Sequence, residues 1–269
     1  MRVALAIVVA LLGVSIGAPA MAESAQIETS APVAAPEQPD EAQSTSAERP
    51  SRGGVHALFR DIAHDFTHLA SGPNLFLAAA GGATSLAVHP FDPSLNAHLR
   101  SHREAVNDIF APARYYGDTP EQMGISLATC VVGRLTDRPK VVQFGVELFR
   151  AQIVDGALTE SLKLSVRRLR PDGSNRHSFP SGHTSVTFAA ATLVERRLGW
   201  KPGLIAYAVA SYVAASRLHD NVHYLSDVVF GAAVGAIAGR TVARDGGNGW
   251  TIGPTAVPGG LMIVAARTR

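Results

Sequence analysis

The feature that most constrains the fold is a long succession of helix-forming segments with almost no strand signal between them. In the first segment Leu58, Ile62 and Phe66 recur at the spacing of one helix face. The exception is 250–266, where Gly and Pro interrupt short β-branched stretches, a pattern typical of a hairpin. The expected fold is an all-α helical bundle with a short C-terminal β-hairpin. The sequence predicts helices over 56–70, 74–89, 104–110, 121–135, 141–169, 184–198, 203–216 and 226–243.

The uncharged stretches are too short to predict a membrane-spanning helix cleanly. The longest cover 73–91, 202–216 and 228–239, whereas a span needs about 20 apolar residues. The first contains two glycines, Thr84, Ser85 and His89, and its Ala/Gly character suits close packing between helices. We therefore expect a soluble or peripherally attached domain. An integral membrane bundle is the alternative, because rules based on length misjudge short or tilted helices.

The N-terminal fifth of the chain is not expected to belong to the fold. Residues 1–22 predict a secretory signal peptide: Arg2 precedes an uncharged apolar run, and Ala-Met-Ala ends at position 22. Residues 23–54 are rich in Ala, Pro, Ser, Glu and Gln, which indicates a disordered linker. The folded domain is then 55–269, with a helical core at about 56–243, in a protein exported to a bacterial periplasm.

Composition excludes several classes of protein. The chain is 46% hydrophobic and 17% charged, which is incompatible with a mostly disordered protein. A net charge of +2 supplies no basic excess for binding nucleic acid. The single cysteine, Cys130, excludes an internal disulfide and a cysteine-rich zinc site.

Three segments carry residues suited to chemistry, and the first is KLSVRRLRP at 163–171. Lys163 and Arg170 are seven residues apart, so two helical turns would place both cations on one face. Pro171 disfavours helical geometry at Arg170 and should end the helix there. Two cations at a helix end suit an anion with several charges. Taken alone, a solvated basic face is the simpler interpretation, and we expect it for Arg167 and Arg168.

The second segment, FPSGH at 179–183, opens the next helix. Ser181 is placed as an N-cap, and Gly182 permits a close approach that a Cβ atom would block. Backbone N–H groups at such a helix start form an anion site. His183 lies beside it and has an ordinary pKa near neutrality, which makes it a candidate general acid.

The third segment is SRLHDNVHYLSD at 216–227. Arg217 ends one helix, and Asn221 tolerates the left-handed geometry of a turn. His223 and Asp227 are spaced i, i+4, so the carboxylate could fix one ring nitrogen and present the other as a nucleophile.

Together and in this order, the three segments resemble the signature of the type 2 phosphatidic acid phosphatase and vanadium haloperoxidase superfamily. The resemblance covers 163–227 and implies an all-α core and a metal-independent phosphatase that hydrolyses phosphate monoesters through a phosphohistidine. His223 would be the nucleophile, His183 the general acid and Asp227 the support of His223. The substrate could be a lipid phosphate, an isoprenoid pyrophosphate or a small organic phosphate, with the membrane surface as a further partner. The implied phosphate-binding residues are Lys163, Arg170, Ser181, Gly182 and Arg217.

Three alternatives use the same residues. A vanadium-dependent haloperoxidase would hold vanadate, its cofactor, with the same cationic phosphate-binding residues, here called the clamp. The compact spacing of the segments favours a phosphatase, which needs no cofactor. A metal site could use His219, His223 and Asp227, but Asn221 argues against one helix through all three. A non-catalytic module that binds an anion or a lipid phosphate would lack a working nucleophile.

Overall fold

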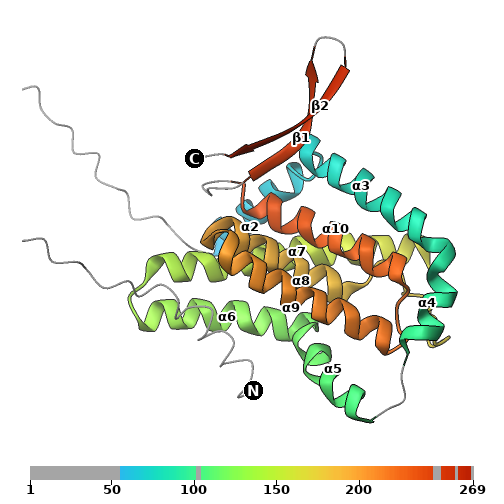
Figure 1. The fold of residues 1–269 in the computed structure, drawn as a ribbon. Helices are drawn as coiled ribbons and strands as arrows, with labels where there is room; N and C mark the ends of the chain where they lie inside the picture. The colour runs from blue at the N-terminus through green and yellow to red at the C-terminus, as the bar shows by residue number, and fades with distance from the viewer. Residues whose placement is uncertain (1–54, 101–103, 245–249, 258–259, 268–269) are drawn as a thin grey trace, which may run out of the picture.

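The computed structural model describes residues 55–100, 104–244, 250–257 and 260–267. The predicted signal peptide and linker lie outside these residues. The described part is helical except for one hairpin (Figure 1). Its helices are α2 (Val55–Thr67), α3 (Gly72–Val88), the 3₁₀ turn η2 (His89–Phe91), α4 (Asp92–Leu99), α5 (Glu104–Tyr116), α6 (Thr119–Leu135), α7 (Pro139–Val166), α8 (Gly182–Leu198), α9 (Trp200–His219) and α10 (Leu225–Val242).

The predicted helices are all present, with shifted ends. One helix, α4, was not predicted; it is eight residues long and begins with Asp92 and Pro93. The predicted hairpin is formed by β1 (Trp250–Val257) and β2 (Gly260–Arg267), which pair antiparallel with Trp250 opposite Arg267. It extends from the helical body beside α3 (Figure 1).

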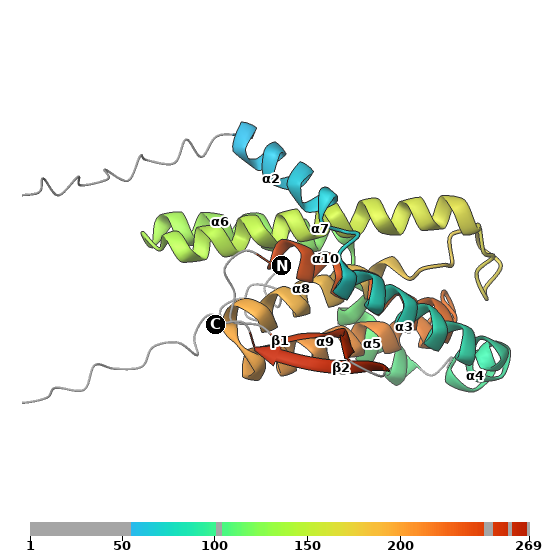
Figure 2. The ribbon, with the colours of Figure 1, turned by 90° about the horizontal axis from the view of Figure 1, so that it is seen from above.

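Helix α8 lies at the centre of the bundle, between α7, α9 and α10 (Figure 2). Eleven of its 17 residues are buried, which a helix can sustain only when neighbours cover most of its circumference. The main core cluster joins Leu193 of α8 to Leu148 and Val154 of α7 and to Ala238 of α10. The small side chains of this core allow the helix axes to approach closely.

A stripe of glycines on α10 makes the closest of these approaches. Gly231, Gly235 and Gly239 are four residues apart and therefore share one face. A Cβ atom at each would lie 2.7, 2.0 or 2.5 Å from the carbonyl oxygens of Ser181, Ser185 and Ala189, respectively. Only glycine fits at these distances, so the stripe fixes how α10 lies along α8.

Four helix termini meet at one end of the bundle. The C-termini of α7 and α9 and the N-termini of α8 and α10 lie together, with α4 alongside, in both views of the ribbon (Figures 1 and 2). The three segments that the sequence analysis identified are the connections at this end.

Candidate active site

The segment after α7 differs from its prediction. The helix ends at Val166, before the predicted end at 169, because Arg167 adopts a left-handed conformation with φ 51°. Lys163 and Arg170 therefore do not share one helix face: Lys163 lies in the last turn, and Arg170 lies in the loop, where its N–H donates to the carbonyl of Asn175 at 3.0 Å. Both cations still act on one histidine, His183, whose pKa each of them lowers.

The start of α8 lies against both of the other segments. Ser181 is the N-cap residue, as predicted, but its side chain makes no cap bond; its hydroxyl accepts a hydrogen bond from Thr184 at 3.0 Å. Its backbone N–H donates to the carbonyl of Asp227 at 3.1 Å. A Cβ atom on Gly182 would lie 3.1 Å from the Nζ atom of Lys163. The glycine therefore allows a lysine ammonium to approach the N-terminus of a helix.

The His223 ring is buried between α9 and α10 and held by the backbone. Its Nδ1 lies 2.7 Å from the carbonyl oxygen of Ser178. A carbonyl can only accept, so Nδ1 carries the proton and Nε2 keeps its lone pair. The carboxylate of Asp227 lies 3.8 Å from Nδ1, beyond hydrogen-bond distance. The expectation that Asp227 itself fixes the ring is therefore wrong: Ser178 does so, and Asp227 adds charge nearby.

Asp227 is fully buried and accepts hydrogen bonds from three other residues. The hydroxyl of Ser178 donates at 2.5 Å and the backbone N–H of Tyr224 at 2.9 Å. The guanidinium of Arg168 donates at 2.6 Å. Ser178 thus contacts His223 through its carbonyl and Asp227 through its hydroxyl, which joins the two residues in one network.

The prediction for Arg168 was wrong. Its side chain is only 19% exposed and lies between two buried carboxylates, Asp92 and Asp227. Its guanidinium carbon also lies 4.1 Å from the ring centroid of Tyr224. Sequence alone could not reveal this, because Asp92 lies 76 positions away along the chain, on a helix that was not predicted.

A carboxylate that sequence analysis missed, Asp118, lies beside the candidate general acid. The Nε2 atom of His183 is 2.8 Å from Asp118 Oδ1, in the turn between α5 and α6. A Cβ atom on the preceding residue, Gly117, would lie 2.9 Å from the His183 ring, so the turn packs directly against it. The sequence signal for Asp118 was the Gly-Asp pair that precedes a predicted helix. The sequence did not indicate that His183 would be its partner.

The electrostatics of the site suit a bound anion. Burial, together with the charges of Arg217 and Lys163, lowers the pKa of His183 to about 3. Burial also lowers the pKa of His223, a shift that Asp227 opposes. Both rings are therefore neutral near pH 7, as a nucleophilic histidine must be.

The arginine side chains of the site also favour a bound anion. Arg217 is buried and donates to Asp220 at 2.5 Å, while Arg114 holds the other side of that carboxylate at 2.7 Å. Within the described residues, the Nε–H of Arg170 is a buried donor without a hydrogen-bond partner. A donor of this kind fits an oxyanion.

His219 does not lie with His223 and Asp227 on one helix. It ends α9, its Nε2 lies 2.8 Å from Asn107 Oδ1, and its ring stacks on Phe110. His223 lies in the connection and Asp227 in α10. In the described part of the chain, no three His, Cys, Asp or Glu side chains are grouped as metal ligands.

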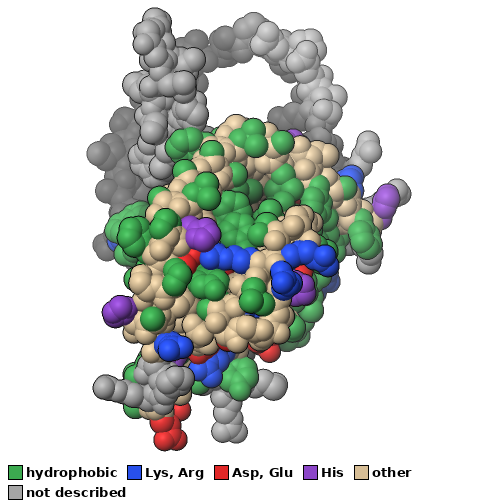
Figure 3. All heavy atoms as spheres, turned by 90° about the vertical axis from the view of Figure 1, so that its right-hand side faces the viewer, with side chains coloured by type: hydrophobic (Ala, Val, Ile, Leu, Met, Phe, Trp, Pro, Cys, Tyr) green, Lys and Arg blue, Asp and Glu red, His purple; other side chains and the backbone are tan. Residues whose placement is uncertain are grey.

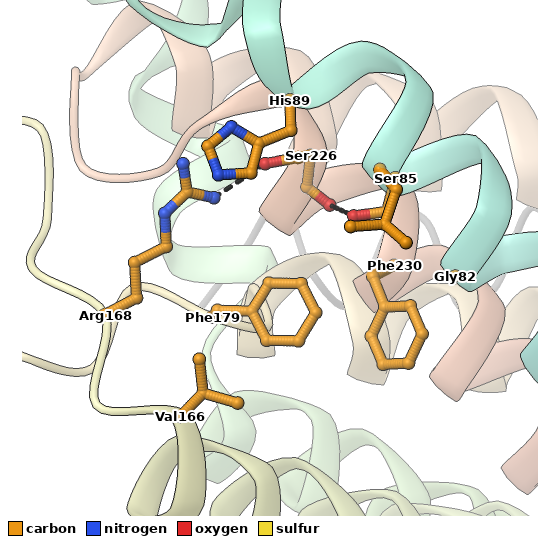
Figure 4. Close-up of a pocket in the computed structure, with 9 residues that line it drawn as sticks. Gly82, Ser85, His89, Val166, Arg168, Phe179, Ser226 and Phe230 are labelled. Atoms are coloured by element: carbon orange, nitrogen blue, oxygen red, sulfur yellow. Dashed lines mark hydrogen bonds between the residues drawn. The ribbon is translucent and has the colours of Figure 1, made fainter.

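A cavity of about 240 Å³ lies beside the Arg168 network, between α3, α10 and the segment before α8. Figure 4 shows Phe179, Phe230 and Val166 around it, with Arg168 pointing toward Ser226. The two phenyl rings stack with centroids 4.9 Å apart. On this end of the molecule, Lys and Arg side chains lie next to a hollow with hydrophobic side chains (Figure 3).

Two curated proteins are similar to part of the chain. The lipid A 1-phosphatase of Porphyromonas gingivalis is 44% identical over 88 residues, which are 32% of this chain and 20% of the relative. The decaprenylphosphoryl-5-phosphoribose phosphatase of Mycobacterium tuberculosis is 37% identical over 101 residues, 34% of this chain and 55% of the relative. The chain thus spans about a fifth and about half of the length of these relatives.

The fold and the family follow from two further matches. The crystal structure of a transmembrane PAP2 type phosphatidylglycerolphosphate phosphatase from Bacillus subtilis is 21% identical; the match covers 68% of this chain and 94% of that one, with a TM-score of 0.52. The helical arrangement is therefore shared. Residues 144–248, which hold all three segments, match the family described as the PAP2 superfamily. The chain therefore contains a PAP2 superfamily domain.

Proposed function

We propose that the protein is a phosphatase that hydrolyses phosphate monoesters through a phosphohistidine on His223. The observation that carries the proposal is the state of this ring: Nδ1–H is bound to the carbonyl of Ser178, which leaves the lone pair of Nε2 to attack. The neighbouring charges are those of a phosphate site, since Arg170 lowers the pKa of both histidines. The activities of the relatives support the same chemistry.

The reaction has two displacements. Nε2 of His223 attacks phosphorus, the bond from phosphorus to the ester oxygen breaks, and His183 gives its proton to the leaving oxygen. His183 then takes a proton from water, whose oxygen attacks the phosphohistidine; the P–N bond breaks and phosphate leaves. The bound phosphate offsets the cations around His183 and so raises the proton affinity of that ring in the complex.

The side chains of Lys163, Arg170 and Arg217 neutralise the charge that develops on the phosphoryl oxygens, with Ser181 and the Gly182 amide as further donors. We propose no metal or other cofactor for this scheme. Vanadate would occupy the same clamp as an analogue of the transition state. These assignments follow from the residues at the site and from the resemblance of the three segments.

We propose a lipid phosphate as the substrate class. The names of the two relatives describe phosphatases of lipid A and of a decaprenyl phosphosugar. The apolar cavity near Phe179 offers a surface for hydrocarbon close to the segment that enters the active site.

Association with the membrane follows from such a substrate. One described helix, α10, is long and apolar enough to cross a membrane, but 61% of that window is buried in the bundle. Large apolar side chains are exposed on α3 and α9, including Leu86, Trp200 and Leu204. We propose that these surfaces contact lipid and that the domain is exported by the N-terminal signal peptide.

The test is an assay of the purified full chain with and without detergent, in the presence of EDTA. Phosphatidic acid, an isoprenyl pyrophosphate and p-nitrophenyl phosphate serve as substrates. We expect hydrolysis of a lipid phosphate and, after rapid quenching with labelled substrate, an acid-labile, base-stable phosphoenzyme that His223→Ala lacks. Full activity in His223→Ala would overturn the nucleophile, and halide oxidation with vanadate and peroxide but no hydrolysis would overturn the phosphatase.

A further inference from the structure

We infer that Arg168, together with Asp92 of α4, is a positioning residue that holds the nucleophile His223 through Asp227 and Ser178. The inference rests on the proposed function and deepens it, because it assigns a role to two residues to which the resemblance of the three segments assigns none. Asp92 also lies outside the stretch that matches the family.

The contacts of Arg168 are those of a bridge between two buried carboxylates. Its Nη1 donates to Asp227 Oδ1 and to the hydroxyl of Ser226, both at 2.6 Å. Its Nη2 donates to Asp92 Oδ2 at 2.8 Å. Asp92 and Asp227 are 1% and 0% exposed. Buried carboxylates are stable only when they are paired and hydrogen-bonded, so one guanidinium satisfies both.

Helix α4 binds both sides of the connection that carries His223. Asp92 accepts from the backbone N–H of Ser226 at 3.0 Å and from its hydroxyl at 2.5 Å, which fixes the start of α10. Asn96, one turn further along α4, donates to the carbonyl of His223 at 3.1 Å. From the other side, Ser85 of α3 donates to the carbonyl of Ser226 at 2.9 Å, as the dashed line in Figure 4 marks.

The planar guanidinium suits this position better than an ammonium. Its two terminal nitrogens donate to different carboxylates, and its central carbon lies over the ring of Tyr224, 4.1 Å from the centroid. A lysine has one compact donor group on a flexible stem and cannot reproduce the fork. Arg168 therefore controls the position of Asp227 as well as its charge.

We expect the charge of Arg168 to act on His223 through Asp227. The charged or titratable groups that face His223 are Asp227, Arg170 and His183. Asp227 favours the protonated ring, whereas Arg168 balances part of the Asp227 charge. The bridge thus helps to keep Nε2 unprotonated, and Asp92 moderates the bridge because it shares the same guanidinium. Removing Arg168 and removing Asp92 should therefore shift the protonation of His223 in opposite directions.

The experiment compares Arg168→Gln, Arg168→Lys and Asp92→Asn with wild type and with Arg167→Gln. This last variant removes the same charge from the exposed neighbouring residue. The substrate is p-nitrophenyl phosphate, and kcat and KM are measured from pH 4 to pH 9. Far-UV circular dichroism reports the folded fraction of each variant. His223→Ala is measured in parallel to show that the activity belongs to the proposed site.

We expect Arg168→Gln to lower kcat about 10- to 100-fold, as for other residues that orient a reacting group. KM should stay near the wild-type value, because Lys163, Arg170 and Arg217 are untouched. The acid limb of the kcat/KM profile is the pH range in which protonation of His223 lowers activity. It should move to higher pH by about one unit for Arg168→Gln and to lower pH for Asp92→Asn. Arg168→Lys should keep the wild-type limb and recover part of kcat, and Arg167→Gln should match wild type.

The inference is overturned if Arg168→Gln keeps the wild-type kcat and acid limb, or if activity in the variants falls only in proportion to the folded fraction. Limbs that move in the same direction in Arg168→Gln and Asp92→Asn would also overturn it. Should Arg168→Gln fail to fold, Arg168→Lys and Asp92→Asn decide instead: Arg168→Lys should keep the wild-type acid limb with a lower kcat, whereas Asp92→Asn should move the limb to lower pH. A limb that stays in place or moves to higher pH in Asp92→Asn would then overturn the inference. Activity that survives in His223→Ala would contradict the proposed function, whereas the results above concern the bridge alone.

Discussion

At the scale of single residues, His183 lies between opposing charges. The cations of the clamp disfavour its protonated form, while the carboxylate of Asp118, 2.8 Å from Nε2, favours it. A general acid, the role proposed for His183, must carry its proton when the ester bond breaks. Asp118 is therefore expected to set how far toward high pH the protonated ring persists in the complex.

Asp118→Asn should move the basic limb of kcat to lower pH, because the neutral amide no longer stabilises the imidazolium. The measurement is the pH dependence of kcat on a saturating phosphate monoester. Glu121→Gln is the matched control, since Glu121 is exposed and lies near Asp118 without contacting His183. A basic limb that moves equally in both variants would mean that only the general negative potential of this region matters.

His183→Gln tests the identity of the acid through the leaving group. An alkoxide needs a proton as it departs, so the first turnover on an alkyl phosphate should slow by ~10²–10⁴-fold. Nitrophenolate departs without one, and release of p-nitrophenol in a single turnover should slow much less. The comparison uses rapid-quench measurements of both substrates. Equal losses on both would assign His183 to phosphate binding rather than to proton transfer.

Individual residues also show the limit of prediction from sequence. Both histidines and the residues of the three segments could be named as candidates because each belongs to a local pattern with fixed spacing, and the structure places these segments at the ends of α7, α8, α9 and α10. Ser178, Asp92 and Asp118 could not, since their roles depend on contacts with residues far along the chain. Arg168 was misassigned for the same reason: a cation in a basic run looks solvated until its carboxylate partners are located.

At the scale of elements, the register of α10 on α8 sets the position of the proposed nucleophile relative to the proposed phosphate site. The glycine stripe brings α10 to the backbone of α8, and the hydrogen bond from Ser181 N–H to the Asp227 carbonyl joins the starts of the two helices. The register was not evident from sequence, because the glycines were consistent with any close helix pair. Both helices could be predicted from the sequence, because their segments are long and uninterrupted.

Gly235→Ala should therefore destabilise the protein. Its Cβ atom would lie 2.0 Å from the carbonyl oxygen of Ser185, and overpacking of this kind costs about 1–3 kcal/mol of unfolding free energy. Gly124→Ala on α6 is the control: no atom lies within 4 Å of its Cβ, so helix propensity should add up to ~1 kcal/mol. Denaturant unfolding measures both. A stabilised Gly235→Ala protein would contradict the close approach of the two helices.

At the scale of the whole molecule, the buried histidines and a buried aspartate make the unfolding free energy depend on pH in opposite directions. Burial and nearby cations lower the pKa of His183, and burial lowers that of His223, so the folded state keeps both neutral where the unfolded chain would protonate them. Burial raises the pKa of Asp155 to about 7, against hydrogen bonding from Ser185, so the folded state keeps this carboxyl protonated. The histidines favour high pH and the aspartate favours low pH.

The histidine contribution should decrease the unfolding free energy as pH falls below about 6.5, where the unfolded chain binds protons that the folded state rejects. His183→Gln should reduce this slope between pH 6.5 and pH 4. Asp155→Asn should act on the opposite trend. It should abolish the decrease in unfolding free energy that the Asp155 carboxyl causes in the wild type as pH rises from 4 through about 7. Denaturant unfolding of the three proteins at closely spaced pH values separates the two contributions. A steeper acid slope in His183→Gln would show that this histidine is protonated in the folded state and that the cation clamp does not act on it as described.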